Sequence, residues 1–177
     1  MKRFCFLFFF LFIVVASFFC IPTAALQISR KTDGQILFRS KIREGESFST
    51  VIRHSVHLTP VFENYEVNDK GLIVLTGTRL QDFGWGVPSA VSEDMELNDD
   101  FFDIRGMSKL FDSIPFRVSQ INNPAFLFRN KQYYLLDLVP DGERIEITAK
   151  KTTLGVYIFL GGNIDAFSEI PSATERH

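Results

Sequence analysis

The sequence has few cysteines, few histidines and only one tryptophan, and these shortages exclude several kinds of site. Its 177 residues contain two cysteines, Cys5 and Cys20, and both precede residue 26. The rest of the chain therefore cannot depend on disulfides for its stability. A zinc site needs three convergent ligands. With only three histidines in the chain, we expect no metal site, and no motif indicates a cofactor.

The chain also lacks an excess of positive charge. Its formal net charge is −2, and it becomes −4 when the first 25 residues, which hold two basic and no acidic side chains, are set aside. Such a domain has no electrostatic attraction for nucleic acid or for an anionic membrane surface. We therefore expect no nucleic-acid partner.

The N-terminal segment has the layout of an export signal. Lys2 and Arg3 precede an apolar run from Phe4 to Ile21, and Thr23-Ala24-Ala25 offers a cleavage site. The run is also long enough to span a bilayer, so a cleaved signal and a retained anchor both stay open. Either outcome places the rest of the chain in the periplasm or on the outer face of the cytoplasmic membrane. We expect membrane contact only through this segment.

After this segment, apolar residues recur mostly with a period of two, in short runs separated by turn residues. This pattern predicts an all-β fold, a single antiparallel β-sandwich or small barrel of about 8–10 short strands, preceded by an N-terminal hydrophobic helix. The expected organisation is a signal or anchor at 1–25, an exported β-domain at 26–152 and a partly ordered C-terminal extension at 153–177. The predicted strands are 35–40, 47–57, 61–67, 72–80, 101–105, 115–119, 125–129, 132–138 and 144–150.

Two segments are harder to assign from their pattern. Residues 107–112 are the best candidate for a turn or two of helix. Residues 154–160 are apolar enough for a tenth strand or a docking segment, but too short to span a membrane.

The stretch RHSVHLTPVFENYEV at 53–67 gathers the most polar chemistry. Alternation along a strand places His54 on the apolar face and His57 and Ser55 on the other. If the chain turns at 58–59 or 59–60, His54 lies across from Glu63 or Tyr65. This pair is either a hydrogen-bonded pair that fixes strand register or a general acid and base.

Three further motifs carry candidate residues. The loop FGWGVP at 83–88 presents Trp85 between Gly84 and Gly86, either as an anchor for a partner or as a core plug. The acidic segment 89–100 lacks the spacing of the common calcium loop, so a solvated run of charge is expected there. Arg117 has the opposite parity to its apolar neighbours and is either a surface charge or a contact for an anion.

Several separated motifs occur together in an order that resembles one family. They are HSV…TPV.E.Y.V at 54–67, GLIVL at 71–75, FGWGVP at 83–88, PFRVSQI at 115–121 and LVPDGERIEI at 138–147. The chain resembles the domain of unknown function 1850 from about residue 36 to 148. It departs from the family at Trp85, where a small residue is expected, and in the extension after residue 150.

The resemblance implies a small exported protein of the kind often encoded beside TRAP transporters with TAXI-type solute receptors, by association only. It transfers no catalytic role. We therefore expect a non-enzymatic binding module whose partner is a transporter subunit, its solute receptor or a small polar ligand. The candidate binding residues are His54, Glu63, Tyr65, Gly84, Trp85, Gly86 and Arg117. The alternatives are a hydrolase or isomerase that uses His54 and Glu63, and a purely structural envelope protein.

Overall fold

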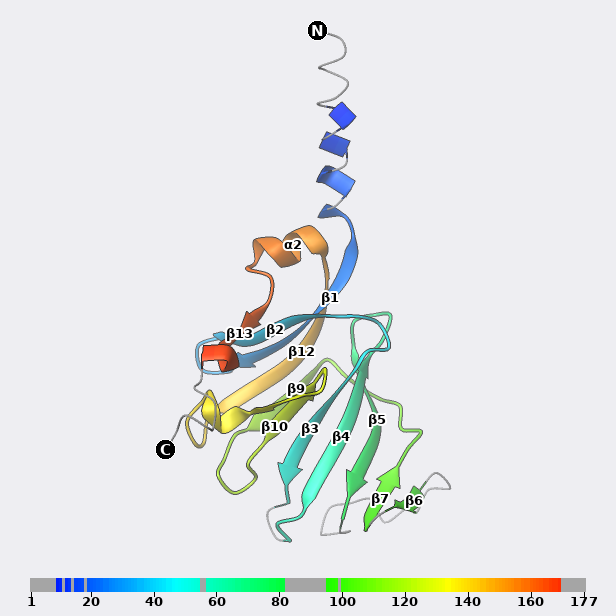
Figure 1. Ribbon diagram of the computed structural model, residues 1–177, viewed down its shortest axis with the longest axis vertical. Coiled ribbons are helices and arrows are strands. Elements are labelled where there is room, and N and C mark those ends of the chain that lie inside the picture. Colours follow the sequence, from blue (N-terminus) through cyan, green and yellow to red (C-terminus); the bar gives the residue numbers. More distant parts are fainter. Residues whose placement is uncertain are drawn as a thin grey trace.

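Two open antiparallel β-sheets form the body of the protein (Figure 1). The computed structural model describes residues 9–10, 12–13, 15–17, 19–54, 57–81, 95–98 and 100–169. One sheet has five strands in the order β13-β2-β1-β12-β9. The other has eight, in the order β11-β10-β3-β4-β5-β7-β6, with β8 paired to β5.

The elements follow one another along the chain as short strands with little helix. They are β1 (Pro22–Arg30), β2 (Ile36–Ile42), β3 (Ser47–Arg53), β4 (Pro60–Val67), β5 (Ile73–Leu80), β6 (Met95–Asn98), β7 (Phe101–Ile104), β8 (Lys109–Phe111), β9 (Ser113–Arg117), β10 (Ala125–Phe128), β11 (Lys131–Tyr134), η1 (Leu135–Asp137), β12 (Arg144–Thr153), α2 (Leu154–Phe159), β13 (Ile164–Asp165) and η2 (Ala166–Glu169).

The core lies where the inner faces of the two sheets meet. Leu26 and Ile28 of β1 are fully buried, as is Phe126 of β10. The ring of Phe38 on β2 meets that of Phe126 edge-on, with centroids 5.3 Å apart, so the two sheets are in direct contact. Aromatic pairs of this kind add to the stabilisation that burial alone gives.

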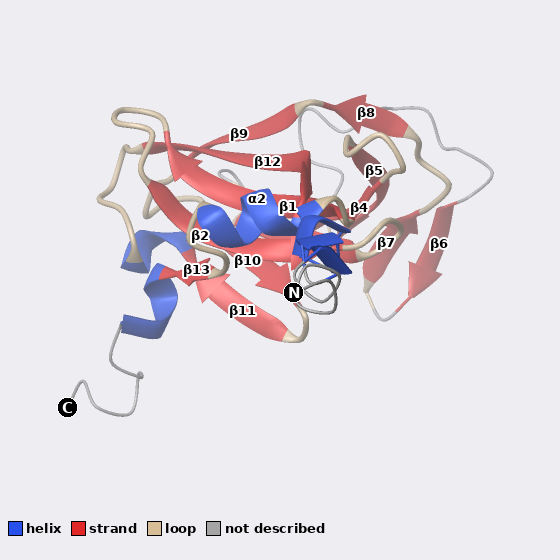
Figure 2. Cartoon of the chain, turned by 90° about the horizontal axis from the view of Figure 1, so that it is seen from above, coloured by secondary structure: helices blue, strands red, loops and turns tan. Residues whose placement is uncertain are grey.

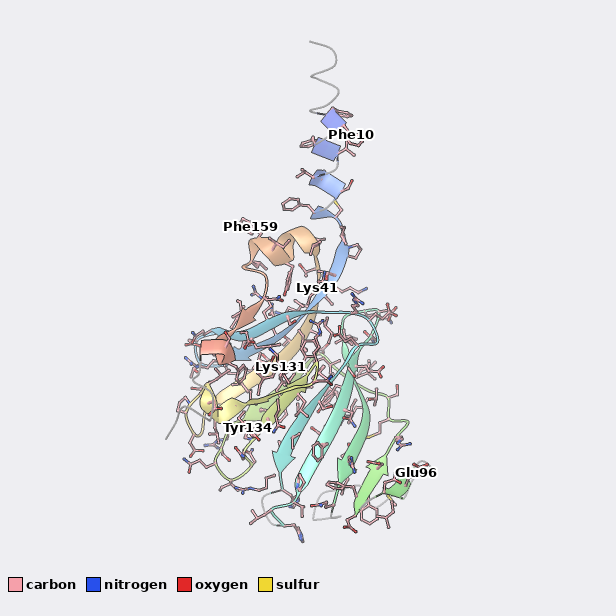
Figure 3. All side chains as sticks on the ribbon, viewed as in Figure 1. Phe10, Lys41, Glu96, Lys131, Tyr134 and Phe159 are labelled. Atoms are coloured by element: carbon pink, nitrogen blue, oxygen red, sulfur yellow. The ribbon has the colours of Figure 1, made fainter. Side chains whose placement is uncertain are left out.

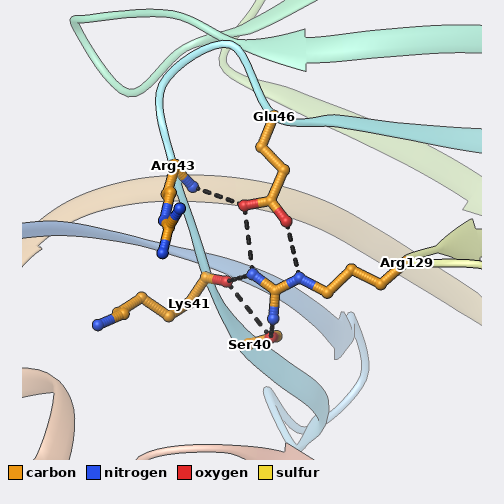
Figure 4. Close-up of polar contacts among 5 residues, drawn as sticks. All are labelled: Ser40, Lys41, Arg43, Glu46 and Arg129. Carbon is orange, nitrogen blue, oxygen red and sulfur yellow. Dashed lines mark hydrogen bonds and ion pairs between the residues drawn. The ribbon is translucent and has the colours of Figure 1, made fainter.

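An arginine clamp joins the corner between β2 and β3 to the turn between β10 and β11 (Figure 4). Arg129 Nε lies 2.7 Å from Glu46 Oε1, and its Nη2 donates to the Lys41 carbonyl at 2.7 Å. Burial of Glu46 opposes ionisation, but the hydrogen bonds from Arg129 and from the Arg43 N–H outweigh it and lower the pKa of Glu46. Glu46 and Arg129 both adjoin the eight-stranded sheet, and the hydrogen bond from Arg129 to the Lys41 carbonyl on β2 links this pair to the five-stranded sheet.

The all-β prediction is confirmed, but the closed-barrel alternative is wrong because both sheets are open. Each of the nine predicted strands overlaps an observed one, although β3 already ends at Arg53 and 132–138 finishes as η1. The helix predicted at 107–112 is wrong because β8 pairs there with β5. Of the two alternatives for 154–160, the tenth strand is wrong because this segment forms the helix α2, and the docking segment stays a prediction. Pattern reasoning also missed β1, β6 and β13.

β1 is the central strand of its sheet, with β2 on one side and β12 on the other. It begins at Pro22, so cleavage after Ala25 would cut within the strand. The predicted N-terminal helix falls largely on residues outside the described ranges and stays a prediction. No helix among the described residues is long and apolar enough to cross a membrane.

Candidate functional site

The β3–β4 hairpin does not bring His54 to Glu63. The last pair of its ladder is Arg53 with Pro60, and the chain reverses over 54–59, where Leu58 has a φ of 56°. This register sets Thr50, not His54, opposite Glu63. His54 lies four residues beyond Thr50, about 13 Å further along the strand direction. The predicted His54–Glu63 pair is therefore wrong, because the turn is longer than the two-residue turn we expected.

The two histidines that parity placed on opposite faces lie together in the turn. Their ring centroids are 5.4 Å apart, and the backbone N–H of His57 donates to His54 Nδ1 at 3.4 Å. Successive side chains point to opposite faces of a strand, but not in a turn. Alternation therefore predicts the direction of side chains only as far as Arg53, where β3 ends. Ser55 lies outside the described residues.

Glu63 faces inward and is held by two hydroxyl groups. Tyr65 Oη donates to Glu63 Oε2 at 2.8 Å, and Thr50 Oγ1 lies 3.4 Å from the same oxygen. Tyr65 is 2% exposed and stacks on Phe48 at 5.2 Å. Burial, with the Glu63 charge in support, raises the pKa of Tyr65, so the phenol keeps its proton and remains a donor. We call Thr50, Glu63 and Tyr65 the inner cluster.

The outer face of the same strands carries a cleft of about 580 Å³. Ser49 and Asn64 line it, with Ser49 Oγ donating to Asn64 Oδ1 at 2.8 Å. Gly77 lies beside them on β5, where a Cβ atom would come within 2.7 Å of the Ile104 carbonyl oxygen. The lack of a side chain at Gly77 therefore lets the chain at 104–105 close one side of the cleft. We call this feature the outer cleft.

Two arginines border the outer cleft around a shared carboxylate. Arg79 Nε lies 3.4 Å from Asp103 Oδ1, and Arg105 Nη2 lies 3.6 Å from Asp103 Oδ2. The Arg79 guanidinium also stacks over the Phe101 ring at 4.3 Å. The Arg79 Nε–H is buried, and within the described part of the chain it makes no hydrogen bond of good geometry. The Arg79 side chain as a whole is 40% exposed and that of Arg105 is 62% exposed, so a molecule in the cleft can reach both side chains.

The other predicted site residues are separated from both features or cannot be placed. Gly84, Trp85 and Gly86 lie outside the described residues. β4 begins after the histidine turn, and β5 ends shortly before the 83–88 loop. These two strand ends lie side by side, because Val61 pairs with Leu80. Arg117 is exposed on β9, in the five-stranded sheet, and pairs with Arg144.

Sequence reasoning missed the outer cleft, although one signal for it was available. Alternation already separates Ser49 and Asn64 from Phe48 and Tyr65, so the outward polar positions were readable. The contact between Arg79 and Asp103 could not be predicted from the local pattern, because it depends on the pairing of β7 with β5. Within the described residues, no three histidine, cysteine, aspartate or glutamate side chains gather closely enough to hold a metal ion.

Comparison with known proteins finds one family. The model of DUF1850, a domain of unknown function, matches residues 48–135 and supports assignment of the chain to that family. The match runs from β3 to β11 and so covers almost all of the eight-stranded sheet. It is shorter than the span of about 36–148 over which the motifs occur. No curated protein and no solved structure matches the chain.

Proposed function

On the premise that the chain is a DUF1850 protein, we propose that it is an exported, non-enzymatic binding domain of a solute uptake system of the TRAP-TAXI type. Its ligand is a small polar molecule with an anionic group, and the outer cleft holds it. The observation that carries this proposal is the pair of partly exposed arginine side chains, Arg79 and Arg105, at the border of a cleft of about 580 Å³. Ligand sites in proteins are commonly of this size.

The chemistry of the outer cleft fits an anion that also carries hydroxyl or amide groups. Arg79 and Arg105 supply guanidinium donors, which suit a carboxylate or a phosphate. Ser49, Asn64 and Thr76 supply donors and acceptors for neutral polar groups. Asp103 pairs with both arginines and Glu96 pairs with Arg105, and each guanidinium has further N–H groups that an anion can use.

The geometry does not favour the rival acid–base function. That function requires His54 and Glu63 at hydrogen-bond distance, whereas the β3–β4 register separates them by four residues. The Glu63 carboxylate accepts hydrogen bonds from Tyr65 and Thr50 on the buried face. These contacts suit the register-fixing role, in which hydroxyl groups donate hydrogen bonds to a half-buried carboxylate.

Native mass spectrometry of the full chain purified from its own membranes tests the proposal. We expect a small bound anion on the wild-type chain and on Tyr65→Phe, a variant of the inner cluster. The bound mass should be lost in Arg79→Gln, which keeps the size of the residue but removes its charge. Co-purified transporter subunits or solute receptor would support the uptake role. A wild-type chain without any bound small molecule would contradict ligand binding and favour a structural role.

A further inference from the structure

The short helix α2 exposes large apolar side chains in a rigid setting. Its sequence, with the residue that follows, is LGVYIFL at 154–160. Phe159 is 86% exposed, and Val156, Ile158 and Leu160 are each about half exposed. Scattered apolar residues are normal on a protein surface, but several on one short helix form a patch.

Polar contacts fix α2 with this patch facing outward. Thr153 caps the helix, with its Oγ1 accepting from the Val156 N–H at 3.4 Å. Tyr157 turns inward and donates its hydroxyl to Asn163. The buried Arg39 donates to the Leu160 carbonyl at the end of the helix. The exposed apolar side chains are therefore held in place and do not result from a frayed end.

The patch is continuous with the apolar N-terminal segment. The Leu154 N–H donates to the Ile21 carbonyl at 2.8 Å. The Phe19 ring lies so close to Gly155 that an added Cβ would come within 2.0 Å of it. Phe159 and Phe10 lie at the same end of the molecule, opposite Glu96 (Figure 3). Viewed onto this end, α2 lies beside the N-terminal segment, above the five-stranded sheet (Figure 2).

Basic side chains surround the point where this segment meets β1. Lys41, Arg43 and Lys151 border a shallow cleft of about 410 Å³ together with Pro22 and two acidic residues, Glu44 and Asp69. Lys41 and Lys151 flank the start of β1, opposite Ala25 and Ala24. Lysine and arginine at such a position can extend their charges to lipid headgroups while their stems lie along apolar surface.

We propose that α2 is a membrane-docking element. Its apolar side chains, Val156, Ile158, Phe159 and Leu160, lie in the interface of the same bilayer that receives the N-terminal segment. The partner is thus a lipid surface, and the chain contacts it at two places, not one. This differs from our expectation of contact through residues 1–25 alone, and it is independent of the outer cleft.

Three observations favour a bilayer over a protein partner. The hydrogen bond between Leu154 and Ile21 keeps α2 beside the apolar segment wherever that segment inserts. The patch on α2 consists of four exposed apolar side chains, whereas a stable protein–protein interface uses roughly 20–30 residues on each side. Apolar and aromatic side chains next to lysines are also typical of segments that lie in the membrane interface.

Depth-dependent fluorescence quenching tests this proposal on the full chain. Trp85 is replaced by phenylalanine, and a single tryptophan is then introduced by Phe159→Trp or, as a second reporter, by Ile158→Trp. The matched control is Ile121→Trp, an exposed apolar position in the loop that Arg53 holds at the far end of β3. Each variant is reconstituted in phosphatidylethanolamine–phosphatidylglycerol vesicles with and without brominated acyl chains.

We expect bromine to quench both α2 reporters severalfold more than the reporter at position 121, and their emission to shift to shorter wavelength. Equal quenching at all three positions would overturn the proposal. So would failure of the full chain to bind the vesicles. Quenching of neither α2 reporter, together with dimers cross-linked through α2, would also overturn it and identify a second copy as the occupant.

Discussion

The two faces of strands β3, β4 and β5 carry polar residues under opposite conditions. On the inner face, Glu63 is paired with Tyr65 and Thr50, and these three side chains satisfy one another. On the outer face, Ser49, Asn64 and the partly exposed Arg79 border an open cleft. Glu63 and Tyr65 from the predicted cluster thus pair with each other and with Thr50, while Ser49 and Asn64 at the alternating positions line the cleft that we propose as the ligand site.

Filling the outer cleft at Gly77 should have the largest effect. In Gly77→Val the new side chain would collide with the Ile104 carbonyl, and we expect the free energy of unfolding to fall by about 3 kcal/mol. Urea denaturation measures this change. Gly34→Ala is the control, because Gly34 has a φ of +72° but open space around it and should cost only about 1 kcal/mol. Equal losses in the two variants would refute the close approach at Gly77.

Removing one hydroxyl from the inner cluster should separate stability from binding. Tyr65→Phe leaves Glu63 with Thr50 alone, so we expect a loss of about 2 kcal/mol in the free energy of unfolding. Ser49→Ala on the outer face should change it by no more than about 0.5 kcal/mol. Thermal and urea unfolding of both variants provide the measurement. If Ser49→Ala proved the more destabilising, the assignment of the two faces would be reversed.

The Glu46–Arg129 pair lies apart from both the inner cluster and the outer cleft, so it serves as a control for the effect of removing a paired carboxylate. The pKa of Glu46 is lowered in the folded protein, so its stabilisation is complete above the ordinary value of 4.5 and is lost as the pH falls through the folded-state pKa. Glu46→Gln should lower the free energy of unfolding by about 1 kcal/mol near neutral pH. It should also make the fall in stability below pH 4.5 less steep. Melting temperatures between pH 3 and pH 7 measure this, and parallel curves for the two proteins would contradict it.

The smallest effect is expected at Arg117, which lies on the five-stranded sheet away from both features. Arg117→Ala should change the free energy of unfolding by no more than about 0.5 kcal/mol, because the side chain is exposed. It should also leave the bound anion in place in native mass spectrometry. A variant that loses the anion would move the binding site to β9.

Much of the strand pattern could be predicted because period-two alternation and turn residues act locally. The turn at Asn68–Gly71 is an example, since Asn68 Oδ1 accepts from two following N–H groups and Gly71 has a φ of 77°. β1 could not be predicted, because its apolar start merges with the export-type segment that precedes it. Its role as a central strand depends on β12, more than a hundred residues further along the chain.

The candidate site was harder to predict because register decides it. A turn a few residues longer than expected moved His54 away from Glu63 and brought Thr50 there instead. The contact of Arg79 with Asp103 depends on the pairing of β5 with β7 across the segment 82–94. Such contacts between distant strands leave no local signature in the residues that make them.

A titration followed by two-dimensional ¹H–¹⁵N NMR tests the central claim most directly. The wild-type chain in detergent micelles is titrated with acetate, succinate, glutamate and phosphate in turn, and backbone amide shifts are mapped. We expect at least one anion to shift the amides of Ser49, Asn64, Gly77, Arg79 and Arg105, while those of Thr50 and His54 stay unchanged. Shifts centred on His54 and Glu63, or none with any of the four anions, would contradict it.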